Sequence, residues 1–436
     1  MEEKKVAEQK PQVPVQARSK KWILGLVGGV FFVLVALVVF LPQPYYTEGF
    51  KTLSELQEYA KTIDENIKMD GKNIFFPSYE SYYRRKFEAS FLNILKDKIN
   101  WILYKCRCKV RPYFSSSFFR TLLIDVLSCR EQKNLNGIYV QKINLTESSK
   151  IVVFGVVQGA FHSLVRDLSE LKNLGILDEN LRVLQADYHL VFLGNVINRS
   201  PYTLETLSIV LRLLEENPDN VVYLKGTNEF FDYWKLHTLQ RELELRLKNY
   251  SVSSTPLERE VCDFFDSLPV TLYCLVPTNN INSLDYFKVF PFIQDEKILS
   301  MLGKFNYYNF LTQSLEKQIA TIQISDIPTV VNQELNSQKL VLRANVGYIK
   351  KRQDYELMDG LRLLDTIDGV TTWTVLSSPT ESFRIGWNFF YDAFSVIAFD
   401  QKLKTWTISL RNRDIRNNNL TFKRSDYHFF SGQSVA

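Results

Sequence analysis

The stretch Ile151-Val-Val-Phe-Gly155-Val-Val-Gln-Gly159 joins a short apolar run to a loop bounded by two glycines. The same arrangement returns at Leu190-Val-Phe-Leu-Gly194-Asn-Val-Ile-Asn-Arg-Ser200 and at Val221-Val-Tyr-Leu-Lys-Gly226-Thr-Asn-Glu229. Each apolar run has the length of a buried strand, and a helical pattern of apolar residues follows each loop. This repetition indicates an α/β sheet, in which ligand sites form at the carboxyl ends of the strands.

The chain changes character after the third loop. A further amphipathic helix is expected at 236–247, and Thr255-Pro256 predicts the start of another, because proline is favoured at the first helical position. The segments that follow are rich in β-branched and aromatic residues, which favours strands of a second sheet packed on the first. These segments are 270–276, 341–344, 372–376, 394–399 and 406–410.

The three loops together resemble those of the phosphoprotein phosphatase branch of the calcineurin-like metallophosphoesterases. That family writes them Gly-Asp-x-His-Gly, Gly-Asp-x-x-Asp-Arg-Gly and Gly-Asn-His-Glu, in the same order and at similar spacing. Three later segments, 265–274, 342–345 and 374–379, are similar to the family's two late histidine segments and its closing loop. The resemblance implies an α/β (α+β) domain at 149–414 with a four-layer αββα sandwich of two mixed β-sheets.

The family's chemistry uses two divalent metals, which hold the phosphate and generate the attacking hydroxide. Hard cations of this kind require carboxylate, imidazole and amide ligands. At the positions that the family gives to metal ligands and acid–base groups, this chain carries uncharged residues: Val156, Gln158, Asn195, Asn198, Thr227, Asn228 and Asn345. We therefore predict a pseudophosphatase, with no metal cofactor and no catalytic residues.

Three charged residues stay at positions that match the family's motifs. Arg199 stands where the family has a phosphate-binding arginine, Lys225 precedes the third loop where the family has another arginine, and Glu229 ends that loop. For Arg199, one interpretation is a salt bridge that holds the loops together. The other is a residual phosphate or phosphopeptide site built from these residues and loop amides.

Residues 22–41 contain no charged side chain, and twenty residues span about 30 Å, the thickness of a bilayer core. We predict a single uncleaved transmembrane helix here, because the run is longer than a signal peptide's apolar region and no small-residue cleavage site follows it. Lysines and arginines crowd the preceding tail, 1–21, and the first basic residue after the run is Lys51. The positive-inside rule then places the N-terminus in the cytoplasm and the large domain on the other side of the membrane, which in a bacterium is the periplasm.

The rest of the chain is assigned by pattern. Residues 42–148 are expected to form a helical membrane-proximal region that opens with the capping box Thr52-x-x-Glu55, and 415–436 a C-terminal tail. Cys106 and Cys108 make a weak metal half-site at most, since no second cysteine or histidine pair lies nearby. The net charge of +5 is modest and sits mainly in the tail and at 96–111, so nucleic acid is not an expected partner.

The leading prediction is a membrane-anchored, catalytically inactive binding or scaffold protein on the non-cytoplasmic side, with an envelope complex as one setting and an unidentified protein partner. The first alternative is a divergent phosphoesterase with a remodelled metal site. The second is a phospho-ligand sensor that uses Arg199 and Lys225.

Overall fold

The computed structural model describes most of the large domain and a few segments before it. The described residues are 29, 50–62, 68–70, 73–75, 116–133, 135, 140–146, 148–198, 200, 202–235, 239–240, 242–243, 256–276, 285–290, 340–343, 359–367, 370–382, 387–400, 405–416 and 421–430. The chain divides into two compact units, residues 1–45 with 89–112 and residues 46–88 with 113–436. All described residues except Gly29 belong to the second unit.

The first six-stranded sheet holds the three strands predicted from the glycine loops. Its strand order is β16-β15-β14-β4-β5-β6. The strands β4, β5 and β6 run parallel, and β14, β15 and β16 pair antiparallel beside them, so the sheet is mixed. The bounds are β4 Lys150–Phe154, β5 Tyr188–Phe192, β6 Val221–Tyr223, β14 Tyr391–Asp400, β15 Thr405–Asp414 and β16 Lys423–Phe430.

The second sheet is also six-stranded and mixed, with the order β10-β11-β9-β8-β7-β3. Its bounds are β3 Val140–Asn144, β7 Thr271–Val276, β8 Asp285–Phe290, β9 Leu340–Arg343, β10 Leu361–Ile367 and β11 Val370–Val375. Two short pairs complete the strands, β1 Lys68–Asp70 with β2 Asn73–Phe75 and β12 Thr380–Ser382 with β13 Trp387–Phe389.

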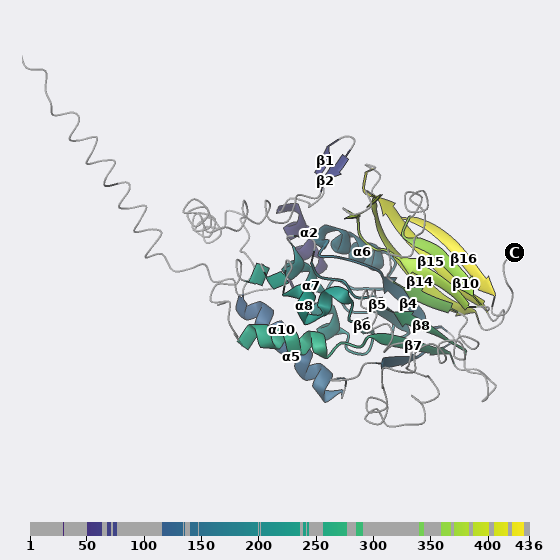
Figure 1. Cartoon of the computed structure of the whole chain (residues 1–436), viewed down its shortest axis with the longest axis horizontal. Helices are drawn as coiled ribbons and strands as arrows, with labels where there is room; N and C mark the ends of the chain where they lie inside the picture. Colours follow the sequence, from purple (N-terminus) through teal and green to yellow (C-terminus); the bar gives the residue numbers. More distant parts are fainter. Residues whose placement is uncertain are drawn as a thin grey trace, which may run out of the picture. The chain divides into compact units, whose positions relative to one another are not determined.

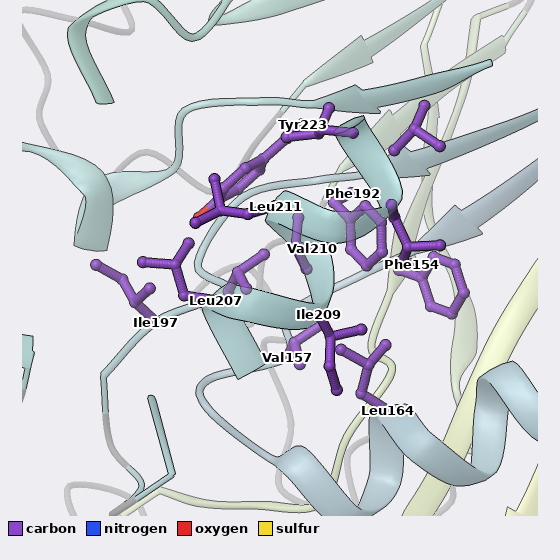
Figure 2. Packing of buried hydrophobic residues seen from close by; sticks show 14 of the residues in the cluster. Phe154, Val157, Leu164, Phe192, Ile197, Leu207, Ile209, Val210, Leu211 and Tyr223 are labelled. Atoms are coloured by element: carbon purple, nitrogen blue, oxygen red, sulfur yellow. The ribbon is translucent and has the colours of Figure 1, made fainter. Parts of the chain in front are cut away.

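Helices pack on one face of the first sheet (Figure 1). They are α2 Leu53–Thr62, α5 Ser116–Gln132, α6 Phe161–Asn173, α7 Thr203–Glu216, α8 Phe231–Trp234 and α10 Pro256–Asp266, with a 3₁₀ turn, η1, at Thr227–Glu229. Figure 2 shows Phe154 and Phe192 of the sheet beside Val210 of α7, and these two rings stack with centroids 4.7 Å apart. The alternate residues, such as Val153 and Val191, face the second sheet and join its apolar side chains in a separate core.

The described residues thus form three layers, helices on a mixed sheet on a second mixed sheet, which agrees with a mixed α/β fold. Both faces of β4, β5 and β6 are buried, and this explains why their sequences are continuous apolar runs. The second helical layer of the expected four-layer sandwich stays a prediction.

Two assignments of the domain boundaries differ from the structure. β3 lies within 42–148, the expected helical region, yet it pairs in parallel with β7 as a strand of the second sheet. β16 lies within 415–436, the expected tail, yet it pairs with β15 along eight residues. Both are edge strands with mixed polar composition, so their apolar patterns are weak and only pairing with a neighbour reveals them.

The helices α2 and α5, in the segment expected to be membrane-proximal, are part of the same core. The expected capping box is present, because the Glu55 amide donates to Thr52 Oγ1 at 3.2 Å and the Thr52 amide donates to the Glu55 carboxylate at 3.2 Å. Leu53 and Leu56 of α2 are fully buried in the cluster that covers the first sheet.

The predicted membrane span at 22–41 falls outside the described residues apart from Gly29. Within the part of the chain that the structure describes, no helix is both long enough and apolar enough to cross a bilayer.

Candidate functional site

The three glycine loops meet at one edge of the first sheet, because β4, β5 and β6 are parallel neighbours. Backbone hydrogen bonds join the first loop to the second. The Gln158 amide donates to the Asn195 carbonyl oxygen at 2.8 Å, and the Gly159 amide donates to the Val196 carbonyl oxygen at 2.6 Å. The predicted convergence of the loops is therefore present.

The second and third loops cross where no side chain fits. Gly194 has a φ of +80°, and a Cβ placed on it would lie 2.4 Å from the Gly226 nitrogen. A Cβ placed on Gly226 would in turn lie 2.5 Å from the Asn195 nitrogen. Contacts this short are prohibitive for a side chain, so both glycines are required by backbone geometry.

A buried carboxylate ties the third loop to the second. Glu229 is fully buried, and its two oxygens accept hydrogen bonds from the Asn195 amide at 2.8 Å and the Val196 amide at 2.9 Å. The Tyr223 hydroxyl donates to the same carboxylate at 2.8 Å. Burial raises the pKa of Glu229, and these hydrogen bonds act in the opposite direction. The Glu229 carboxylate is thus occupied by hydrogen bonds within the loops and from β6.

Asn195, which matches the family's bridging ligand, also links loops. Its side-chain oxygen accepts a hydrogen bond from the Asn228 amide at 2.8 Å. The Asn228 side chain donates in turn to the Ile197 carbonyl oxygen at 3.1 Å. Asn195 has a φ of +52°, a left-handed conformation that asparagine tolerates better than most residues.

Asn198 of the second loop and Thr227 of the third are buried as well. Asn198 has a φ of +71°, and its side-chain oxygen accepts from the Leu239 amide at 3.1 Å. Thr227 is 3% exposed. These residues pack into the loop structure and do not line an open cation cage.

The first loop is held from the opposite side by two serines. Ser377 Oγ accepts from the Gly155 amide at 2.7 Å. Ser378 Oγ donates toward the carbonyl oxygens of Val156 at 2.9 Å and Val157 at 2.8 Å. Val156 is 4% exposed, so this position places a hydrocarbon in the protein interior.

The first loop ends in Gln158, which is half-buried. Its φ is +52°, another left-handed conformation. Gln158 stands where the family has a histidine, and it offers a neutral carboxamide in place of an imidazole.

Lys225 is buried beside the third loop. Its Nζ donates to Asp266 Oδ1 at 2.6 Å and lies 4.5 Å from the centroid of the Phe230 ring. Asp266 is highly exposed, with 71% of its side chain accessible. Lys225 thus forms a salt bridge with Asp266 of α10, whereas the salt bridge expected for Arg199 stays a prediction. Arg199, Asn345, Cys106 and Cys108 lie outside the described residues.

The family that the sequence resembles uses two divalent metals, and the residues at the corresponding positions differ from the ligands that such metals need. The described positions provide amides, a hydroxyl and a hydrocarbon, and the Asn195 oxygen already accepts a backbone hydrogen bond. Within the described ranges, no group of three or more His, Cys, Asp and Glu side chains is placed to hold a metal ion. These residues do not fit a two-metal centre, which requires clustered anionic and imidazole ligands.

The sequence did not point to one residue that supports the site. The Glu242 carboxylate accepts hydrogen bonds from the Thr203 amide at 2.9 Å and the Leu204 amide at 3.0 Å, and so caps the first turn of α7 directly after the second loop. Glu242 is distant in sequence and lies in an ordinary amphipathic pattern. No local signal could have identified it.

Comparison with known proteins agrees with this architecture. No protein family model matches the chain. A stretch of 170 residues is 26% identical to the serine/threonine-protein phosphatase 6 catalytic subunit of Caenorhabditis elegans, and it covers 39% of this chain. The match spans 43% of that relative, less than half of its length.

Two solved structures are similar at low identity. One is a protein serine/threonine phosphatase from Saccharomyces cerevisiae with similarity to human phosphatase PP5, at 13% identity and a TM-score of 0.44, covering 78% of this chain and 97% of that chain. The other is a cold-active protein-tyrosine phosphatase of a psychrophilic Shewanella, at 13% identity and a TM-score of 0.37, covering 66% and 83%. The sequence homology, with the sheet order and loops above, gives this chain a phosphoprotein phosphatase-like, metallophosphoesterase-like fold.

Proposed function

We propose that this chain, with its phosphoprotein phosphatase-like fold, is a non-catalytic binding or scaffold protein anchored in a membrane by residues 22–41. One observation carries the proposal. Asn195, at a ligand position, accepts a hydrogen bond from the Asn228 backbone amide of the third loop, and Glu229 of the third loop accepts from the Asn195 and Val196 amides of the second. The loops are thereby held together by the chain's own hydrogen bonds, without need of a cation.

The chemistry that these loops perform in phosphatases supports the proposal. In-line attack on phosphorus needs a metal-bound hydroxide and positive charge on the phosphate oxygens. Val156 provides no ligand, and Asn195 is a neutral group where a bridging carboxylate is needed. The proposal includes the complete four-layer sandwich, with a second helical layer outside the second sheet.

The placement on the far side of the membrane rests on charge asymmetry around residues 22–41. A domain held there without catalysis is suited to protein contacts, and assembly into an envelope complex is one such role. Partner identity is open to experiment. Crosslinking in intact membranes, followed by purification through a tag on the full chain, should recover a defined partner. Recovery of the chain alone would argue against a scaffold.

A second candidate, a phospho-ligand sensor, is favoured by Lys225. Its ammonium group is buried against Phe230, and its partner Asp266 is an exposed side chain that a phosphate could displace. Arg199 would supply a second cation. Phosphopeptide binding should weaken in Arg199→Ala and Lys225→Met, while Lys133→Met, which removes a surface lysine paired with Asp219, should have no effect.

The decisive experiment is metal analysis of the full chain purified in detergent, with a p-nitrophenyl phosphate assay in manganese. The proposal expects substoichiometric transition metal and no turnover above that of Asn195→Ala. A metal-dependent serine/threonine phosphatase, treated identically, is the positive control. Stoichiometric metal together with turnover that Asn195→Ala abolishes would establish a divergent phosphoesterase instead.

A further inference from the structure

A group of charged side chains is buried where α6 packs on β14, outside the glycine loops. Asp167 of α6 is 1% exposed and Asp392 of β14 is fully buried. Arg166 donates two hydrogen bonds to Asp392, from Nε to Oδ2 at 2.6 Å and from Nη2 to Oδ1 at 3.1 Å. Asp392 is thus neutralised by a bidentate partner, the strongest kind of ion pair in proteins.

Asp167 is in a different position. Its Oδ1 is buried and has no hydrogen-bond partner among the described residues. The charged groups that act on it are Asp392 of β14, Arg166 and Glu170 of α6, and Arg413 of β15. A buried oxygen without a donor is costly when it carries charge.

Other ion pairs around the contact between α6 and β14, which we call the seam, leave less positive charge near Asp167. Arg166 is committed to Asp392, and Arg411 of β15 lies 4.0 Å from Glu170. Burial is the largest cause that raises the pKa of Asp167, the charge of Asp392 adds to it, and the two arginines oppose it. Two buried carboxyl groups in one site favour a state in which one of them keeps its proton.

Both sides of this seam attach to the first glycine loop. The α6 side begins at Phe161, directly after Gly159. On the β14 side, the Ala393 amide donates to the Ser377 carbonyl oxygen at 3.0 Å, and Ser377 Oγ accepts from the Gly155 amide at 2.7 Å. A change at the seam is therefore transmitted to the loop through two short connections.

We propose that protonation of Asp167, in the seam between α6 and β14, controls how often the first glycine loop opens. We call this arrangement a proton-operated latch. While Asp167 holds a proton, α6 stays packed on β14 and the loop is fixed. When that proton passes to water, the buried Asp167 carboxylate carries a charge and its Oδ1 has no donor, so α6 and the loop open more often. This role is independent of whether the loops bind a metal or a partner.

The test is hydrogen exchange of the full chain in detergent, read from peptides that cover residues 155–173 between about pH 6 and about pH 9 and corrected for intrinsic exchange. Protection in the wild type should fall by up to about tenfold per pH unit while the pH lies between the ordinary carboxyl pKa of the open state and the raised pKa of folded Asp167, and it should level off above the latter. In Asp167→Asn, which keeps the shape and removes the titration, protection should be independent of pH.

Glu170→Gln is the matched control, because it removes a carboxylate three residues further along the same helix. It should retain the pH dependence of the wild type. If the protection of residues 155–173 in the wild type does not depend on pH, the proposal is refuted, whatever the variants do. An equal pH dependence in wild type and Asp167→Asn overturns it as well.

Discussion

Single residues at the loop crossing allow a direct test of backbone geometry. Gly194 and Gly175 both have positive φ, +80° and +69°, but a Cβ on Gly194 would lie 2.4 Å from the Gly226 nitrogen, whereas a Cβ on Gly175 would meet nothing within 4 Å. We expect Gly175→Ala to cost about 1 kcal/mol of unfolding free energy, the cost of a left-handed alanine. Gly194→Ala should prevent folding or cost several times more, as measured by soluble yield and urea unfolding.

Equal effects of the two substitutions would show that strain in φ, and not the close approach of two loops, explains Gly194. The comparison is matched because both changes add one methyl group to a glycine in the left-handed region. They differ only in what that methyl group meets.

Glu229 is the residue that joins the second and third loops through hydrogen bonds. Glu229→Gln keeps the shape but turns one acceptor into a donor that faces the amides of Asn195 and Val196. The loss should be about 3 kcal/mol in urea unfolding, because buried donors are left unsatisfied. Tyr223→Phe removes one bond to the same carboxylate and should cost about 1 kcal/mol. A loss for Glu229→Gln no larger than for the exposed Glu131→Gln would contradict this role.

His189 predicts how stability responds to acid. It is 9% exposed and its Nδ1 has no hydrogen-bond partner in the described part of the chain. Burial lowers the pKa of His189, opposed by the charge of Asp187 and a hydrogen bond with the Asp219 backbone. Because the folded-state pKa is lower than the unfolded one, the stability is fully present above about pH 6.5 and falls as pH drops through the folded pKa.

The melting temperature should therefore decline on acidification below about pH 6.5 by more in the wild type than in His189→Leu. Ile151 stands opposite His189 on the neighbouring strand, so an aliphatic side chain is compatible with the site. Parallel declines in the two proteins would assign the acid response to other groups.

At the scale of elements, α2 is a part of the domain core. Leu56 is fully buried, the Tyr59 hydroxyl donates to the buried Glu205 carboxylate at 3.0 Å, and the Leu53 amide donates to the Glu179 carbonyl oxygen at 2.8 Å. Leu56→Ala should destabilise the whole domain by about 3 kcal/mol, through lost burial and a residual cavity. Lys61→Ala on the exposed side of α2 is the control. A spacer that packs loosely would show no effect from either change.

The elements also show what the sequence could predict. The bounds of α7 and the starts of α6 and α10 follow from local signals, namely apolar periodicity, the preceding glycine loops and Pro256. β3 and β16 were missed because an edge strand depends on a partner distant in sequence, β7 or β15. The cap that Glu242 provides for α7 was missed for the same reason, since it joins residues 39 apart.

The candidate site divides in the same way. That the three loops converge followed from their positions after parallel strands, and the uncharged residues could be read directly. The sequence could not show that Asn195 and Glu229 hold the loops together, because the partners of a side chain depend on the loop conformation. Asn195 and Asn198 adopt left-handed conformations that sequence pattern alone does not specify.

For the whole molecule, the proposed loss of the metal centre predicts that metal ions do not change its melting temperature. A ligand present at 100 times its dissociation constant stabilises a protein by about 2.7 kcal/mol, which shifts the melting temperature by several degrees. Since the described loops hold themselves together through Asn195 and Glu229, neither EDTA nor manganese should shift the melting temperature of the full chain. A metal-dependent serine/threonine phosphatase in the same buffers should lose stability in EDTA. If EDTA also lowered the melting temperature of this chain and manganese restored it, a bound cation would stabilise the loops. The hydrogen bonds across the loops would then not have replaced it.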